Sequence, residues 1–245
     1  MKFLLANGCS HTIGCELDPN DMQKCPELTW PRWVADHYGI EYKNMASGGI
    51  GNEQIARSTI LRVSRMIDIE KIDPKDFMVC VLWSGFDRYE YWDKQKDQIR
   101  SFSPHNMKAP WQPEETIRRY AEFRSLVEFE EYSHYKNMYY MYTLAKVLEG
   151  YGIEYHFGNS LNVFRPLERF EGSDNLKQQY KNMIEIYGDR VKNHLGFFDH
   201  RFAFRKYLMD IRPTERSPLG SGSHWGELGQ KRYAELFVKH IEANR

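Results

Sequence analysis

The chain has 245 residues, which is enough for one α/β domain with a full core or for two small domains. Its 34 lysines and arginines are balanced by 34 aspartates and glutamates, so the formal charge is zero. That balance argues against a nucleic-acid or anionic-membrane binder, because either would need a basic excess. The sequence contains no run of 18 apolar residues, and we therefore predict no transmembrane helix.

The chain offers no sign of a leader segment or of a metal centre. Residues 2–6 are too short for the apolar part of a signal peptide, and we interpret them as a first strand. The four cysteines follow no zinc or Cys-x-x-Cys spacing and are typical of reduced thiols: Cys9, Cys15, Cys25 and Cys80. We therefore expect a cytoplasmic protein without a metal or other cofactor.

The first third of the chain alternates short apolar runs with amphipathic segments. Pro31 and Gly39 bound one helix, and Asn52 is a candidate N-cap of the next. The apolar run at 77–82 suits a buried parallel strand. The elements predicted here are strands over 2–7, 41–45 and 77–82, and helices over 30–38 and from residue 52 onward.

The segment 89–130 breaks this pattern, because it mixes aromatic, polar and proline residues over a length unusual for a simple connection. We interpret it as a lid over the carboxyl ends of the strands, partly helical from Pro113. A helix over 131–149 ending at Gly150, a strand over 153–157 and a C-terminal helix follow. A short fifth strand is expected to end near residues 197–199. Such alternation predicts one α/β domain whose parallel sheet is covered on both faces.

Ser10 follows the first strand directly, in the run Asn7-Gly8-Cys9-Ser10-His11-Thr12. A strand that turns into a helix at Gly8 leaves the Ser10 hydroxyl at the carboxyl end of the sheet, where α/β proteins bind ligands. The free N–H groups of a helix N-terminus favour negative charge there. Ser10 is therefore a candidate nucleophile, and the alternative is that it only caps the helix.

His224 stands near the other end of the chain, between a Gly/Ser/Pro loop and the final helix. A lone histidine is more often structural than catalytic. A histidine that opens a terminal helix, together with a serine after the first strand, is a rarer combination. Tyr233, Leu236, Phe237 and Ile241 form one face of this helix, which is expected to pack on the sheet.

These blocks together resemble the SGNH hydrolases, also called GDSL-type esterases and lipases. Gly8-Cys9-Ser10 is similar to the family's Gly-Asp-Ser block, and residues 44–52 are similar to its glycine block. Residues 79–88 stand where the family has Gly-x-Asn-Asp, and His224 stands where it has its histidine. The residues of these blocks are most similar to those of SGNH variants found in phage genomes and bacterial gene clusters. The resemblance implies a three-layer, flavodoxin-like fold with a five-stranded parallel sheet.

The sequence departs from the family pattern at two places. Ser84-Gly85 replaces the asparagine of the third block, and Ser221 and Gly222 stand where the family's aspartate precedes the histidine. We therefore expect the second ring nitrogen of His224 to donate to a backbone carbonyl or serine hydroxyl within 220–222.

The resemblance implies that Ser10 is the nucleophile and His224 the base, with the backbone N–H groups of Ser10 and Gly49 binding the oxyanion. The side chains of Ser84 and Asn52 are neutral candidates for a third donor, and Arg88 is a charged one. The alternative for Ser84 and Asn52 is that each caps a helix. Four residues are candidate substrate contacts: Arg88, Asp87, His11 and Trp225. The alternatives are a surface ion pair for Arg88, a helix cap or an orienting contact for Asp87 and packing for Trp225, while the role of His11 is left open. The alternative for Gly48, Gly49 and Gly51 is that they only permit a tight strand-to-helix turn with positive φ.

The sequence thus predicts a serine esterase that removes short acyl groups, most simply O-acetyl, from a carbohydrate or other small polar ester. The same site would serve an O-acyltransferase, in which a sugar hydroxyl replaces water. A third reading is an inactive domain of this fold that binds a glycan or a partner protein, which the two departures favour. The oligomeric state is left open.

Overall fold

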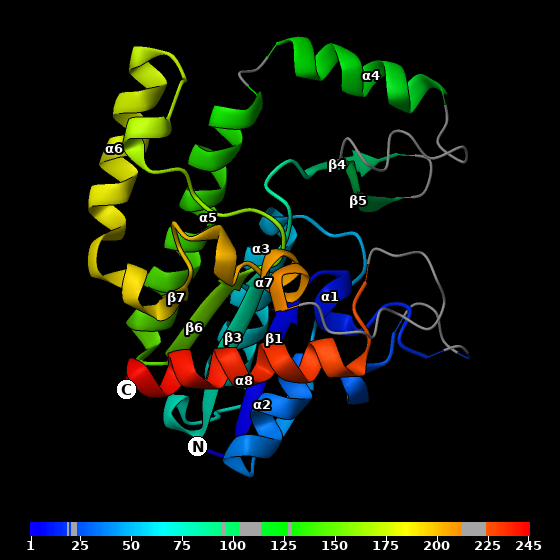
Figure 1. The fold of residues 1–245 in the computed structure, drawn as a ribbon, viewed down its shortest axis with the longest axis vertical. Helices are drawn as coiled ribbons and strands as arrows, with labels where there is room; N and C mark the ends of the chain where they lie inside the picture. The colour runs from blue at the N-terminus through cyan, green and yellow to red at the C-terminus, as the bar shows by residue number, and fades with distance from the viewer. Residues whose placement is uncertain (19, 21–23, 95–96, 103–113, 127–128, 212–223) are drawn as a thin grey trace.

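The computed structural model describes the chain except residues 19, 21–23, 95–96, 103–113, 127–128 and 212–223. A five-stranded sheet, with all pairs parallel and the order β2-β1-β3-β6-β7, forms its centre (Figure 1). Its strands are β1 (Phe3–Gly8), β2 (Glu41–Asn44), β3 (Phe77–Trp83), β6 (Glu154–Asn159) and β7 (His194–Leu195). Helices cover both faces, and the fold is therefore the predicted three-layer α/β/α arrangement.

One face of the sheet is covered by α3 (Asn52–Ser64), α5 (Phe129–Tyr151) and α6 (Asp174–Tyr187). Alternate strand residues such as Val79 and Val81 point to this face and are fully buried. Met141, Leu144 and Leu148 of α5 are also fully buried, as the helical spacing of the sequence predicts.

The opposite face is covered by α2 (Trp30–Tyr38), α7 (Phe204–Ile211) and α8 (Glu227–Ala243). Tyr233, Phe237 and Ile241 of α8 are fully buried against the sheet. The side chain of Gln230 ties this helix to the others: its Oε1 accepts from Trp30 N at 3.1 Å, and its Nε2 donates to the carbonyl of His11 at 3.2 Å. The C-terminal helix is therefore fixed beside the start of the chain.

Most predicted elements are confirmed within a residue or two, and three expectations are wrong. Asn52 is the first residue of α3, and Gly51 is the N-cap residue. Gly150 lies inside α5, and the helix ends before Gly152, whose φ of 72° is left-handed. The fifth strand is β7, which ends two residues before Phe197. Phe197 is a buried core residue instead, stacked on Phe164.

The segment after β3 contains an antiparallel hairpin of β4 (Tyr89–Asp93) and β5 (Gln98–Phe102), followed by α4 (Glu114–Ser125). Figure 1 shows these elements beyond the carboxyl ends of the sheet strands. The sequence pattern did not predict the hairpin. Trp111, one of the aromatic residues of segment 89–130, lies outside the described residues.

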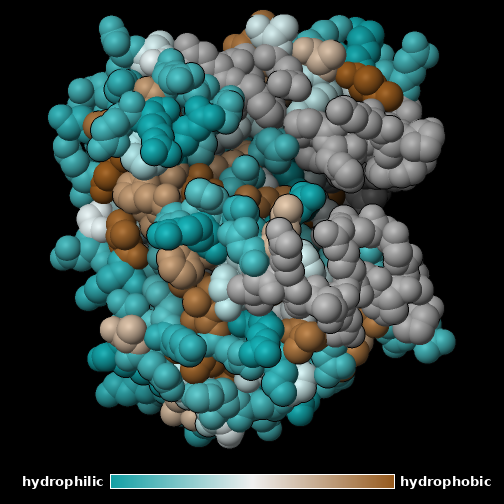
Figure 2. Space-filling model, in the orientation of Figure 1, coloured by the Kyte–Doolittle hydropathy of each residue, from teal (hydrophilic) through white to brown (hydrophobic). Residues whose placement is uncertain are grey.

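The remaining elements are short. They are α1 (Ser10–Ile13) and single helical turns at Pro26–Leu28, Arg65–Ile69, Pro74–Asp76, Leu167–Arg169, Gly188–Asn193 and His200–Phe202. On the face drawn in Figure 2, the described surface is largely hydrophilic. Among the described helices, none combines the length and the apolarity needed to cross a membrane.

Candidate active site

The turn from β1 into α1 places Ser10 at the carboxyl edge of the sheet. A side chain at Gly8 would put its Cβ 2.2 Å from Thr12 Oγ1 and 2.8 Å from the carbonyl oxygen of Leu82, so only glycine fits this turn. Cys9 is the N-cap residue of α1, and Ser10 is the first residue of the helix. Ser10 is therefore not the helix cap, which removes the structural alternative considered for it.

Two asparagines tie this turn to its neighbours. The Asn7 side chain donates to Ser58 Oγ and Thr59 Oγ1 of α3 at 2.9 and 2.8 Å, and its Oδ1 accepts from Gly8 N. The Asn44 side chain donates to the carbonyl of Thr12 at 2.7 Å. The nucleophile turn is thus held from both α3 and the end of β2.

The glycine block leaves β2 beside this turn. The backbone N–H of Ser47 donates to the carbonyl of Gly8 at 3.2 Å, so the two segments are adjacent. Gly49 has a φ of 79°, and a Cβ there would meet no atom within 4 Å. Its requirement for glycine is therefore conformational. The role of its N–H group as an oxyanion donor stays a prediction.

Asn52 and Ser84, both candidate oxyanion donors, are paired with each other. Asn52 Oδ1 accepts from the backbone N–H of Ser84 at 2.7 Å, and Nδ2 donates to the Ser84 carbonyl at 3.2 Å. The same Nδ2 also donates to Asn137 Oδ1 at 2.7 Å. Both hydrogens of the Asn52 amide are therefore engaged inside the protein.

The Ser84 hydroxyl is the candidate oxyanion donor that these hydrogen bonds do not engage. Ser84 is fully buried, and its Oγ has no hydrogen-bond partner among the described residues. Asn137 of α5 fixes the loop further, because its Nδ2 donates to the carbonyls of Phe86 and Ser133. The loop after β3 is thus held by a buried network of side-chain amides.

Arg88 contacts the glycine block from this same loop. Its Nη1 donates to the carbonyl of Ile50 at 2.9 Å, and its Cβ lies 3.3 Å from where a Cβ at Gly51 would be. Asp87 is half-buried, with its Oδ1 only 2.8 Å from a Cβ built on Gly85. These contacts place both residues in the loop that borders the site, and their roles toward a substrate stay predictions.

His224 meets a carboxylate that the sequence did not suggest. Its Nδ1 lies 3.2 Å from Glu16 Oε2, and the two side chains are 15% and 16% exposed. The expectation of a neutral acceptor for this nitrogen is therefore wrong, since an acidic side chain from the loop after α1 occupies that position. Residues 220–222, where we expected the acceptor, lie outside the described residues.

His11 packs directly against His224, with ring centroids 4.8 Å apart. It is 5% exposed, and burial is the main reason that its pKa is well below the usual value, with smaller effects of His224, Arg88 and Arg205. His11 is therefore a neutral ring beside His224. Because Ser10 precedes His11 in α1, the predicted nucleophile and base belong to the same neighbourhood, although their separation stays a prediction.

Aromatic side chains near the site and in segment 89–130, which we call the insertion, differ in exposure. Trp225 is 6% exposed and packs in the core between the sheet and α8, in agreement with its structural alternative. In the insertion, Tyr89 and Tyr120 are buried, whereas Trp92 of β4 is 56% exposed. Trp92 is therefore exposed enough to contact a ligand, whereas Trp225 is mostly buried, and the roles of both toward a substrate stay predictions.

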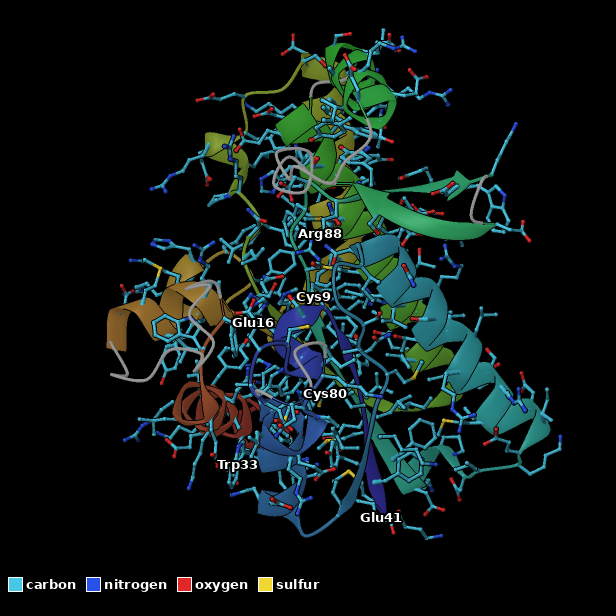
Figure 3. All side chains as sticks on the ribbon, turned by 90° about the vertical axis from the view of Figure 1, so that its right-hand side faces the viewer. Cys9, Glu16, Trp33, Glu41, Cys80 and Arg88 are labelled. Atoms are coloured by element: carbon cyan, nitrogen blue, oxygen red, sulfur yellow. The ribbon has the colours of Figure 1, made fainter. Side chains whose placement is uncertain are left out.

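Sequence reasoning missed Glu16 and Asn137. Neither lies in a recognised block, and both reach the site through space rather than along the chain. Figure 3 shows Cys9, Glu16 and Arg88 near one another, with Trp33 and Glu41 farther along the molecule. The only available signal was that Glu16 follows Ser10 by six residues, within the loop of the same turn.

The sequence matches no protein-family model and no curated protein. Solved structures do share its architecture. One is a carbohydrate esterase family 2 enzyme with its carbohydrate-binding domain from Corynascus thermopiles (Myceliophthora fergusii), at 12% identity and a TM-score of 0.50, covering 99% of this chain and 66% of that one. The chain has the fold of the SGNH hydrolases.

Two further solved structures are similar to this chain. The acetyl xylan esterase Est2A from the rumen bacterium Butyrivibrio proteoclasticus is 11% identical, with a TM-score of 0.50, over 99% of this chain and 64% of its own. A putative lipolytic protein of the G-D-S-L family from Desulfitobacterium hafniense is 15% identical, with a TM-score of 0.46, over 98% of this chain and 99% of its own. At these identities the likeness concerns the SGNH fold.

Proposed function

We propose that this SGNH-fold protein is a serine esterase that removes short acyl groups, most simply O-acetyl, from a carbohydrate or another small polar ester. The observation that carries the proposal is the group of residues at the carboxyl edge of β1. Ser10 opens α1 there, and a mostly buried histidine with a carboxylate on Nδ1 lies beside its neighbour His11. Serine, histidine and carboxylate are the parts of an acyl-transfer site.

In the proposed mechanism, Ser10 Oγ attacks the ester carbonyl while His224 Nε2 takes the hydroxyl proton. The tetrahedral intermediate collapses to an acyl-enzyme as His224 returns the proton to the leaving alcohol. Water then attacks the acyl group by the same proton path, releasing the acid and restoring Ser10.

The oxyanion of each intermediate needs N–H donors. Ser10 is the first residue of α1, and the N–H of that position has no acceptor within its helix. Gly49 lies in the adjacent glycine block, and we propose its N–H as the second donor. The buried Ser84 hydroxyl, which has no partner in the part of the chain that the structure describes, is our candidate for the third donor, because the Asn52 amide is already engaged. Loss of one such donor typically costs about 3 kcal/mol at the barrier.

A fluorophosphonate probe, which labels an activated serine, tests the nucleophile. We expect labelling of the intact chain, none of Ser10→Ala, and retention in Ser47→Ala, which alters an exposed serine nearby. Release of acetate from acetylated sugar by wild type but not by Ser10→Ala would complete the test. Labelling with transfer to a sugar hydroxyl in place of hydrolysis would identify an acyltransferase. Absence of labelling at Ser10 would favour an inactive binding domain.

A further inference from the structure

We propose that Glu16 is the carboxylate that positions His224, in place of an aspartate preceding the histidine. This inference rests on the proposed function, since it assigns a positioning residue to the same site. Glu16 comes from the loop that follows α1. The SGNH pattern has its aspartate two or three residues before the histidine, and in this chain Gly222 and Ser221 stand at those positions. The acid and the nucleophile then belong to one continuous segment of 7 residues, Ser10 to Glu16.

The contact between the two side chains pairs a carboxylate with an imidazole in a protected place, and it becomes an ion pair when His224 is protonated. Glu16 Oε2 lies 3.2 Å from His224 Nδ1, and about five-sixths of each side chain is shielded from solvent. At that burial an ion pair is screened less than it is on the surface. The contact can therefore hold the imidazole in one orientation.

The loop that carries Glu16 is closely tied to α1. Gly14 ends the helix with a left-handed φ of 82°, and its N–H and that of Cys15 both donate to the carbonyl of Ser10. The N–H of Cys25 donates to the carbonyl of Ile13 at 3.1 Å, which anchors the return of the loop. Movement of Glu16 relative to Ser10 is thereby restricted.

Glu16 itself has a φ of 63°, which is costly for a residue with a side chain. Leu17, the next residue, is 5% exposed and anchors the chain on the far side of this strained position. Backbone strain of this kind persists only where the surrounding structure enforces it. Here its result is that the carboxylate faces the histidine.

The position of the carboxylate determines which nitrogen of His224 can act. A carboxylate accepts only, so it favours the tautomer with hydrogen on Nδ1 and leaves Nε2 free to take a proton. His11 packs against the ring of His224, and its lowered pKa leaves it neutral, so it adds no second positive charge there. Glu16 would then stabilise the imidazolium that forms during each proton transfer.

Glu16→Gln tests the inference, with Asp18→Asn as the matched control in the same loop. Asp18 accepts a hydrogen bond from Asn20 N through Oδ1, a bond that asparagine can keep. For Glu16→Gln we expect kcat for acetyl ester hydrolysis to fall on the order of 100-fold or more, with KM little changed. Asp18→Asn should retain the wild-type kcat.

Nitrogen-15 NMR of the labelled histidines gives a readout that does not depend on activity. In wild type and in Asp18→Asn, neutral His224 should carry its hydrogen on Nδ1, whereas in Glu16→Gln the amide can donate to Nδ1 and shift the hydrogen to Nε2. His224→Gln identifies the signal. An unchanged kcat in Glu16→Gln would overturn the role of Glu16. So would an unchanged tautomer in Glu16→Leu, whose side chain neither accepts nor donates a hydrogen bond, whereas the amide oxygen of glutamine can still accept from Nδ1.

The two proposals can fail separately. If Ser10 of wild type is not labelled by the fluorophosphonate probe, the esterase proposal fails, and the tautomer measurement still decides whether Glu16 orients His224. If Ser10 is labelled and Glu16→Gln reacts at the wild-type rate, only the assignment of Glu16 is wrong.

Discussion

The side-chain amide of Asn52 forms hydrogen bonds with both backbone groups of Ser84, at 2.7 Å to the N–H and 3.2 Å to the carbonyl. This pair joins the start of α3 to the end of β3, so the glycine block and the third block of the sequence are held at a fixed separation. Asn137 extends the connection to α5 by accepting from the same amide. The site is thus supported by polar contacts that lie wholly inside the protein.

Removal of this amide should destabilise the protein. Asn52→Ala leaves the backbone N–H and carbonyl of Ser84 and the Oδ1 of Asn137 without their partner in a fully buried place, and each unsatisfied group costs about 1–3 kcal/mol. We expect the free energy of unfolding, measured in urea, to fall by at least about 2 kcal/mol. Asn20→Ala, at an exposed asparagine, is the control. A loss below about 0.5 kcal/mol would contradict the network.

Two glycines that end helices should respond differently to alanine. Gly14 and Gly39 both have left-handed φ angles, which alone cost about 1–2 kcal/mol with a side chain. A Cβ at Gly14 would also lie 2.5 Å from the carbonyl oxygen of Cys25, whereas one at Gly39 would meet no atom within 4 Å.

Gly14→Ala should therefore be the more destabilising change and should also lower kcat, because the loop that carries Glu16 must shift. Gly39→Ala should lower stability modestly and leave kcat unchanged. Thermal unfolding and acetyl ester hydrolysis of the two variants provide the comparison. Equal losses of kcat would contradict a specific role for the loop after α1.

Stability should fall in mild acid because buried histidines stay neutral in the folded state. Burial lowers the pKa of His194 to about 3, and burial, with smaller contributions from neighbouring charges, lowers the pKa values of His134 and His240 to about 4 each. Below pH 6.5 the unfolded chain takes up protons at these residues, and the folded chain does not until pH 4 or lower. The free energy of unfolding should therefore decrease as the pH falls from about 6.5 to 4.

His194→Gln isolates one of these residues. The variant should reduce the slope of unfolding free energy against pH by about 1.4 kcal/mol per pH unit between pH 4 and 6. Above pH 7.5 its slope should match that of wild type, which serves as the internal control. An unaltered slope in the acid range would mean that His194 is protonated in the folded protein.

Ester chain length should separate a small-ester hydrolase from a lipase. The insertion 89–130 contains no apolar run longer than a few residues, and a lipase needs a continuous apolar channel for its acyl chain. We expect p-nitrophenyl acetate and butyrate to be hydrolysed well and laurate poorly, as measured by kcat/KM. A preference for laurate would contradict our interpretation of the insertion.

The sequence predicted the layers of the fold well because periodicity along the chain reports burial. Met141, Leu144 and Leu148 illustrate this, since their spacing alone placed them against the sheet. The hairpin of β4 and β5 was missed because its short strands mix exposed and half-buried residues. Gly150 was taken for a helix end because a glycine in a helix and one just after it look alike in sequence.

Glu16 and Asn137 could not be predicted as site residues because their partners lie far away in the sequence. Glu16 is 208 residues from His224, and Asn137 lies 85 residues beyond Asn52. No local pattern indicates either pair. Residues within one turn, such as Gly8 and Ser10, were identified because the geometry of a single turn constrains them directly.

The attachment of α8 through Gln230 has a consequence for the order in which activity would arise during synthesis. Ser10 and Glu16 leave the ribosome before His224, and the sheet can assemble before residues 224–243 are available. Until α8 docks on α2 and the carbonyl of His11, the nascent chain holds a serine without its base. On the proposed chemistry, a partly made protein would be unable to attack esters in its surroundings, and hydrolysis would begin only with the last packing step.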